Sequence, residues 1–202
     1  DKPAGLLVEA DRPGVEWVET WGDGLALRAA DNHDVYFKNT QVPAENLLDK
    51  RDSPHKQVQP WAPMMFASVY LGIGLAARDA VVRYGLERVP KALGKAIATL
   101  PKIQRLIGEV DMALMAAKAL LLEVAEEEEH ASLARLAAAK QHAVEVANEV
   151  TDKAIRIAGA AGVSRALPLE RYLRDTRAGN MHPPNGDAAL EAVGKGAIAE
   201  IE

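Results

Sequence analysis

The C-terminal tail of the chain, residues 169–187, holds three side chains that could accept or donate a proton. His182 has an imidazole, which titrates near neutral pH and suits proton transfer. Asp175 and Asp187 are the carboxylates nearest to it in this tail. Structural roles also fit these residues: an arginine partner for Asp175, a helix cap for Asp187 and an exposed loop position for His182. The sequence leaves both interpretations open.

A second group of residues could hold a flat or anionic ligand. Arg88 ends a predicted helix and precedes a proline-containing loop, so its guanidinium could grip a diphosphate through two hydrogen bonds. Gly159 and Gly162 permit a sharp backbone turn and the close approach of a ring system. The alternatives are a surface arginine paired with Glu87 and a helix cap followed by a tight connection. The sequence does not choose between them.

Most of the chain has the composition and periodicity of packed helices. Ala, Leu, Glu and Lys dominate the C-terminal part, and aromatic residues make up only 4% of the chain. Apolar residues recur at steps of three and four, which predicts helices over 64–88, 103–124 and 132–157. Shorter helices are expected over 167–177 and 187–199. The pattern predicts an up-and-down bundle of four to five helices.

The N-terminal residues differ in kind, because they alternate like strands and contain turn signals. We expect strands over 4–8 and 33–37, with a turn at 11–14. About three strands with unpaired edges make a marginal sheet, so this segment is expected to belong to a larger β-domain. The predicted fold is mainly α: a small β segment over 1–50, then a helical bundle domain over 51–202.

Composition argues against several classes of function. The formal net charge of −5 gives no general attraction for nucleic acid. Without cysteine, disulfides and thiolate metal sites are impossible, and a reducing, cytoplasmic location is expected. No uninterrupted apolar run reaches the roughly 18 residues that a membrane span needs, so none is expected. The four glutamates at 126–129 beside His130 favour a solvated helix end, and no metal site is predicted.

Seven blocks of sequence, taken in order, resemble the acyl-CoA dehydrogenase family of flavoproteins. The first three are similar to the end of that family's middle β-domain and its exit into the helical domain. The next two are similar to a helix and loop that reach the FAD of a neighbouring subunit. The last two are similar to a Gly-rich turn over the flavin and to the helix that leads into the active site. The blocks lie at 21–28, 35–43, 45–47, 71–88, 93–95, 152–162 and 169–175.

The resemblance implies an FAD-dependent oxidoreductase with cofactor-binding residues Arg88, Leu93, Arg156, Gly159 and Asn185. Leu93 departs from the family because it replaces an aromatic residue, and Arg156 replaces an amide. The resemblance further implies an acyl-CoA or related small-molecule substrate, a part in fatty acid metabolism, and a homodimer or homotetramer formed through the bundle.

The position of the family's catalytic base also departs from the pattern. In typical members a glutamate beyond this last helix removes the α-proton of an acyl thioester, while the flavin takes hydride from the β-carbon. Counting from Arg174 and Asp175, that position is Pro183, which cannot accept a proton. His182 lies beside it, and flavin monooxygenases of this fold carry a histidine at a matching place. His182 is therefore the candidate catalytic residue.

Three functions are consistent with these residues. The first is dehydrogenation of the CH–CH group of an acyl-CoA thioester. The second is flavin-dependent monooxygenation that uses His182. The third is a catalytically inert assembly subunit or fragment that donates Arg88 to another subunit's flavin. The family's N-terminal helical domain and the first part of its β-domain have no counterpart here, so these 202 residues are not expected to form a full active site by themselves.

Overall fold

The computed structural model describes residues 5–48, 61–127 and 130–201. Contacts divide the chain into two compact units, Asp1–Gln57 and Val58–Glu202. Strands occupy the first unit and long helices occupy the second. The predicted fold, a small β segment followed by a helical bundle, is confirmed.

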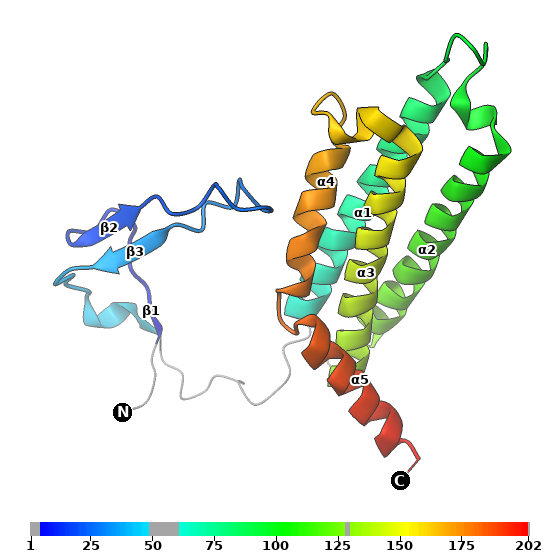
Figure 1. Cartoon of the computed structure of the whole chain (residues 1–202). Helices are drawn as coiled ribbons and strands as arrows, with labels where there is room; N and C mark the ends of the chain where they lie inside the picture. The colour runs from blue at the N-terminus through cyan, green and yellow to red at the C-terminus, as the bar shows by residue number, and fades with distance from the viewer. Residues whose placement is uncertain (1–4, 49–60, 128–129, 202) are drawn as a thin grey trace. The chain divides into compact units, whose positions relative to one another are not determined.

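The described part of the first unit contains two short antiparallel sheets (Figure 1). Strand β1 (Gly5–Leu6) pairs with β4 (Leu47–Leu48). Strand β2 (Val15–Val18) pairs with β3 (Asp34–Phe37), so that Val15 faces Phe37 and Val18 faces Asp34. Each of the two expected strands lies within a few residues of an observed one.

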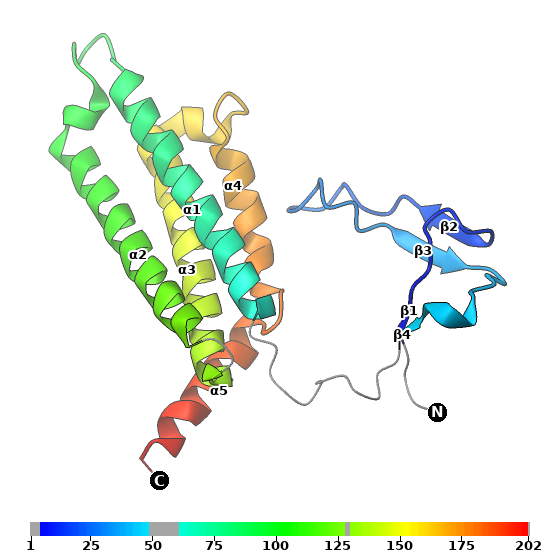
Figure 2. The same cartoon turned by 180° about the vertical axis from the view of Figure 1, so that it is seen from behind.

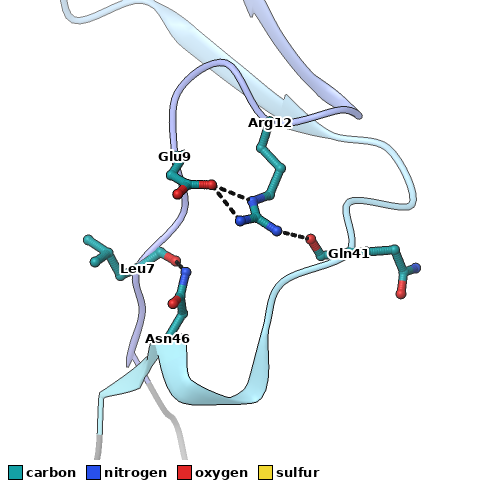
Figure 3. A network of polar contacts seen from close by, with 5 residues as sticks. All are labelled: Leu7, Glu9, Arg12, Gln41 and Asn46. Atoms are coloured by element: carbon teal, nitrogen blue, oxygen red, sulfur yellow. Dashed lines mark hydrogen bonds and ion pairs between the residues drawn. The ribbon is translucent and has the colours of Figure 1, made fainter.

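A polar network links the two ends of this first unit (Figure 3). The Arg12 guanidinium donates to the carboxylate of Glu9 and, at 2.8 Å, to the backbone carbonyl of Gln41. Asn46 Nδ2 donates to the Leu7 carbonyl at 2.9 Å, and the Leu7 amide donates back to the Asn46 carbonyl at 2.9 Å. The Arg12–Gln41 and Leu7–Asn46 bonds join segments that are far apart in the sequence, and they supplement the few strand pairs of the unit.

The described part of the second unit is a bundle of five α-helices (Figures 1 and 2). Helices α1 and α3 run in one direction, and α2 and α4 run in the opposite one, as an up-and-down bundle requires. All five expected helices are present within a few residues of their predicted bounds. They are α1 (Trp61–Glu87), α2 (Pro101–Glu126), α3 (Leu133–Ala158), α4 (Leu169–Thr176) and α5 (Gly186–Ala199).

Helix α3 is the centre of the bundle, because it contacts each of the other four helices. Its buried side chains are mostly alanine and valine, which allow the neighbouring helices to approach closely. The Ser132 hydroxyl caps its start by accepting the Arg135 amide at 3.2 Å. Gly159 caps its end with φ +62°, a backbone conformation that favours glycine.

The acidic stretch follows α2, as the sequence predicts. Helix α2 ends at Glu126, which is exposed. The Arg135 guanidinium bonds Glu127 and Glu123, so this turn is held by ion pairs between α2 and α3. Residues 128 and 129 lie outside the described residues.

Helix α4 is fixed to α3 by one apolar and one polar contact region. Leu169 at its start is fully buried in the core. At its end, the buried hydroxyls of Thr176 and Thr151 lie 3.2 Å apart and form a hydrogen bond. A 3₁₀ turn, η5 (Arg177–Asn180), continues directly from α4 toward α5.

The expected cap of the last helix was wrong. Asn185 caps α5, since its Oδ1 accepts the Ala188 amide at 3.0 Å. Asp187, the expected cap, lies instead in the first turn. Asparagine and aspartate cap helices about equally well, and a carboxylate in the first turn still interacts favourably with the helix dipole. The sequence is therefore compatible with a helix capped by Asn185 and with one capped by Asp187.

Helix α1 is long and apolar enough, by length and composition, to cross a membrane, and it is the one helix of the described residues that meets this test. Eight of its residues are buried in the bundle: Ala67, Tyr70, Leu71, Gly74, Ala77, Ala80, Val81 and Gly85. The apolar character of α1 thus fits a core helix of the bundle.

Gly179 in η5 lies directly against α3 and α1. A Cβ atom at this position would lie 2.7 and 2.9 Å from the two Cγ atoms of Val144 and 3.3 Å from Tyr70 Cδ1. Val144 is fully buried, and its branched side chain has little rotamer freedom in a helix. The path of η5 across the bundle therefore requires glycine here.

We predict that Gly179→Ala lowers the free energy of unfolding by about 1–3 kcal/mol, because the added methyl group overpacks this contact. Gly108→Ala is the matched control, since Gly108 is exposed within α2 and has open space around it. It should raise the free energy of unfolding by about 0.5–1 kcal/mol. Urea unfolding of both variants measures the difference, and equal stabilities would contradict the packing of η5 on α3.

Candidate functional site

The imidazole of His182 is held by two side chains of α1. Its Nδ1 lies 2.8 Å from Tyr70 Oη, and either atom can donate, according to the imidazole tautomer. Its ring stacks on Phe66 with a centroid distance of 4.3 Å and an interplanar angle of 7°. His182 is half-buried and not an exposed loop residue. None of the described residues bonds its Nε2, which leaves that atom available to a ligand.

Helical spacing explains why Phe66 and Tyr70 act together. They are four residues apart on α1, so their side chains share one face of the helix. The segment between α4 and α5 crosses this face and presents His182 to both rings. The contact joins residues 112 positions apart in the chain.

Burial sets the charge states of this pair. Burial lowers the pKa of His182, and the positive charge of Lys140 lowers it further. Burial raises the pKa of Tyr70 to about 12, with a smaller contribution from the negative charge of Asp175 on α4. At neutral pH the imidazole is therefore neutral and the phenol is protonated. A neutral imidazole can accept a proton from a reacting group.

Lys140 of α3 is fully buried and binds the same segment from the other side. Its Nζ donates to the Gly179 carbonyl at 2.7 Å and to the Pro184 carbonyl at 2.9 Å. Burial lowers the pKa of this ammonium group. The segment that carries His182 is thus held between α1 and α3.

An open hollow of about 460 Å³, lined by both polar and apolar side chains, adjoins this segment between α3 and α5. Gln141 Nε2 donates to Glu145 Oε1 at 3.0 Å and to Asn180 Oδ1 at 3.2 Å on its wall. The predicted cofactor residue Asn185 lies at its rim, where its Oδ1 caps α5. The hollow is lined by Gln141, Glu145, Asn180, Met181, Asn185, Gly186, Asp187 and Leu190.

Arg88 and Leu93 lie at the opposite end of α1 from His182. Arg88 is exposed, and its carbonyl accepts the Ile97 amide at 3.0 Å, which closes the loop after the helix. Among the described residues, no carboxylate pairs with Arg88, so the expected alternative of a pair with Glu87 is not seen. Leu93 is half-buried, and its amide donates to the Pro90 carbonyl at 2.9 Å.

Arg156, Gly159 and Gly162 lie at the end of α3. Arg156 is exposed, and Asp152 lies 3.9 Å from its guanidinium. Gly159 caps the helix, and a Cβ there would still meet only open space. A Cβ on Gly162 would lie 3.0 Å from the Ile155 carbonyl oxygen, so this glycine makes the tight connection possible. Both glycines have the structural roles that the sequence offered as alternatives.

The bundle therefore separates the predicted residues into two groups. Both views show the start of α1 and the start of α5 at one end, and the ends of α1 and α3 at the other (Figures 1 and 2). Along α1, the 18 residues from Tyr70 to Arg88 span roughly 27 Å at 1.5 Å per residue. His182 and Asn185 are brought together, and Arg156 and Gly159 are brought together. One short ligand cannot touch both groups on the same chain.

Sequence reasoning missed Phe66, Tyr70 and Lys140. A signal existed for Lys140, because it interrupts an apolar series of α3 at helical spacing, between Leu136 and Ala143. No comparable signal pairs the α1 rings with His182, since that contact depends on the tertiary fold.

The sequence of this chain is similar to known proteins of one family. The model of the family described as "Acyl-CoA dehydrogenase, C-terminal domain" matches residues 64–184. YdbM of Bacillus subtilis (strain 168), which carries an acyl-CoA dehydrogenase name, is 33% identical over 191 residues, covering 92% of this chain and 50% of that protein. The short-chain specific acyl-CoA dehydrogenase of Mus musculus mitochondria is 31% identical, covering 86% of this chain and 43% of that protein.

A solved structure with a different reaction is similar as well. Dibenzothiophene monooxygenase (TdsC) from Paenibacillus sp. A11-2 has a TM-score of 0.81 and 26% identity, covering 95% of this chain and 55% of that one. The chain spans about half the length of the relatives that it matches. The residues that the family model matches, 64–184, include α3, α4 and α1 from Met64 onward, and they end before α5. The chain belongs to the acyl-CoA dehydrogenase family, of which it contains the C-terminal helical domain.

Proposed function

We propose that this chain is part of a flavin-dependent oxidoreductase in which His182 is the acid–base group, and that monooxygenation is its reaction. The observation that carries this proposal is the geometry at the family's base position. Pro183 stands there and is exposed, while the adjacent imidazole is held by Phe66 and Tyr70 with its Nε2 available. The likeness to a monooxygenase over nearly the whole chain is compatible with this choice, although the fold is equally similar to an acyl-CoA dehydrogenase from Geobacillus kaustophilus.

The residues present fit FAD as the cofactor. Gly159 leaves open space where a side chain would otherwise stand, which permits a ring to approach the backbone. The exposed guanidinium groups of Arg88 and Arg156 suit the diphosphate of the cofactor. When bound, the flavin supplies the electron transfer that no side chain of this chain can supply.

The separation of the two groups of residues favours a homodimer or homotetramer. Arg88 lies at one end of the bundle and His182 at the other, so both can serve one flavin only across a subunit interface or along an extended cofactor. We propose that Arg88 of one copy binds the flavin that faces His182 of another copy. A cytoplasmic location is part of the same proposal.

His182 and its neighbours have separate tasks in this proposal. In the tautomer whose Nδ1–H donates to Tyr70 Oη, the neutral imidazole has an unprotonated Nε2, which accepts a proton from a reacting group and later returns it. The hydrogen bond to Tyr70 fixes the direction of Nε2, and the stacked ring of Phe66 limits rotation and excludes water from that face. General acid–base catalysis of this kind contributes a factor of about 10²–10⁴.

Dehydrogenation of an acyl-CoA thioester at its CH–CH group is the second candidate. The names of the two similar proteins from Bacillus subtilis and Mus musculus favour it. In that reaction His182 is the nearest described group to Pro183 that can accept the α-proton. A part in fatty acid metabolism belongs to this second candidate.

We predict that the full-length protein purifies with bound flavin or binds added FAD, which visible absorption would detect. Consumption of oxygen with reduced flavin and substrate would then identify a monooxygenase. Anaerobic bleaching of the flavin by an acyl-CoA would identify a dehydrogenase. A protein that neither carries nor binds flavin would contradict both candidates and favour an assembly subunit.

His182→Ala should lower kcat by about 10²–10⁴, the usual contribution of a general acid or base, while flavin absorption stays unchanged. His130→Ala, at an exposed histidine outside the site, should retain the rate of the unmutated protein. Steady-state kinetics of the flavin-loaded proteins provide the comparison. An unchanged rate in His182→Ala would rule out this residue as the acid–base group.

The pH profile gives an independent check on His182. Burial and the Lys140 charge hold the pKa of His182 below its usual value of 6.5. The base must be neutral to act, so the acidic limb of the kcat/KM profile should be centred below pH 6.5. An acidic limb centred at or above pH 6.5 would contradict the assigned charge state.

A further inference from the structure

Lys140 stands out as a buried cation whose bonded partners are carbonyl groups. Its side chain is fully buried, and among the described residues its ammonium is bonded by the carbonyls of Gly179 and Pro184 and by no carboxylate. Burying a charged group is unfavourable unless hydrogen bonds compensate for lost hydration. Leucine, alanine and valine fill most of the other buried positions of α3, so a cation at this position calls for a specific reason.

The two carbonyls bracket the candidate catalytic residue. Gly179 lies three residues before His182, and Pro184 lies two residues after it. Because both bonds end on one nitrogen atom, at 2.7 and 2.9 Å, the backbone between them is closed into a loop over Lys140. Asn180, at the start of that loop, is bonded by the neighbouring Gln141 of α3 at 3.2 Å.

The loop is held on its other face by α1. Phe66 stacks on the imidazole, and Tyr70 bonds its Nδ1. Gly179 itself packs between Val144 and Tyr70. The imidazole therefore has contacts from α1 on one side and a backbone fixed by α3 on the other.

We propose that Lys140 is a positioning residue for His182: its ammonium closes the loop from Gly179 to Pro184 and thereby holds the imidazole against Phe66 and Tyr70. The use of this imidazole in catalysis rests on the proposed function. The position and the protonation of the His182 imidazole do not depend on the proposed function, so both can be measured without substrate or flavin.

The charge of Lys140 adds a second, measurable effect. Among the described residues, the charged group that acts on His182 is Lys140 from α3, and the one that acts on Tyr70 is Asp175 from α4. A positive charge beside His182 opposes its protonation and lowers its pKa, in addition to the effect of burial. Loss of that charge must therefore raise the pKa of His182.

Nuclear magnetic resonance of the full chain with ¹⁵N-labelled histidine and lysine tests this inference through two readouts. The ring protons of His182 report stacking on Phe66 through an upfield ring-current shift. Their titration reports the pKa of the imidazole. Lys140→Met should remove the ring-current shift and move the pKa of His182 upward. Lys140→Gln, which keeps N–H donors and loses the charge, should keep much of the ring-current shift and also move the pKa upward.

Lys153→Met is the matched control. Lys153 lies on the same helix and pairs with Glu109 and Glu149, away from the His182 loop. Its replacement should leave both readouts of His182 unchanged. The unmutated protein supplies a readout that needs no variant to fold: the His182 ring signals should show a second transition at the pH at which the Lys140 ammonium titrates.

A purely structural role for Lys140 predicts a different pattern. The Lys140 variants would then unfold at lower denaturant concentration, while the folded protein kept the ring-current shift and pKa of the original His182. That result would overturn the inference. So would His182 signals that do not respond when the Lys140 ammonium loses its proton.

Discussion

Helix α3 is packed against all four other helices of the bundle, so most of its buried positions carry small or apolar side chains. It contacts α1, α2, α4 and α5, and alanines and valines fill most of its buried positions. Close approach of the outer helices follows from those small side chains. The path of the segment after α4 is fixed by the same helix, because Gly179 must pass between Val144 and Tyr70. Lys140 is the one charged residue among the buried positions described on α3.

This constraint connects the fold to the candidate chemistry. The buried ammonium holds the loop backbone, and α1 supplies the two rings that hold the imidazole. A half-buried imidazole beside a cation stays neutral, and its bond to a protonated phenol fixes its orientation. The elements that stabilise the bundle therefore also set the position and charge state of His182.

Much of the fold could be predicted from the sequence, because long helices with apolar periodicity leave a clear pattern. The five helices and the cap at Gly159 follow from spacing and glycine chemistry. The cap of α5 could not be predicted in this way, because Asn185 and Asp187 both suit an N-cap position. Only the observed start of the helix identifies Asn185 as the cap. In the first unit, Trp17 and Phe37 remain more than half exposed, and the expectation that this unit belongs to a larger β-domain stays a prediction.

The candidate site could be predicted only in part. His182 was found because it adjoins Pro183, where the family carries its base, and this needs no knowledge of the fold. Phe66 and Tyr70 could not be found, because their contact with His182 forms only when α1 packs beside the loop. The sequence also grouped Asn185 with Arg88, Arg156 and Gly159, whereas the bundle places Asn185 at the end that holds His182 and the other three at the opposite end. The linear sequence contains no signal for this separation.

A crystal structure of the full-length protein with bound flavin would test the central claim most directly, through the distance from His182 Nε2 to the reacting groups. The account predicts that Nε2 faces the flavin ring or its substrate at about 3 Å, or through one water, with Nδ1 still bonded to Tyr70. A flavin ring bound away from His182, with a carboxylate from elsewhere in the protein beside it, would contradict the account.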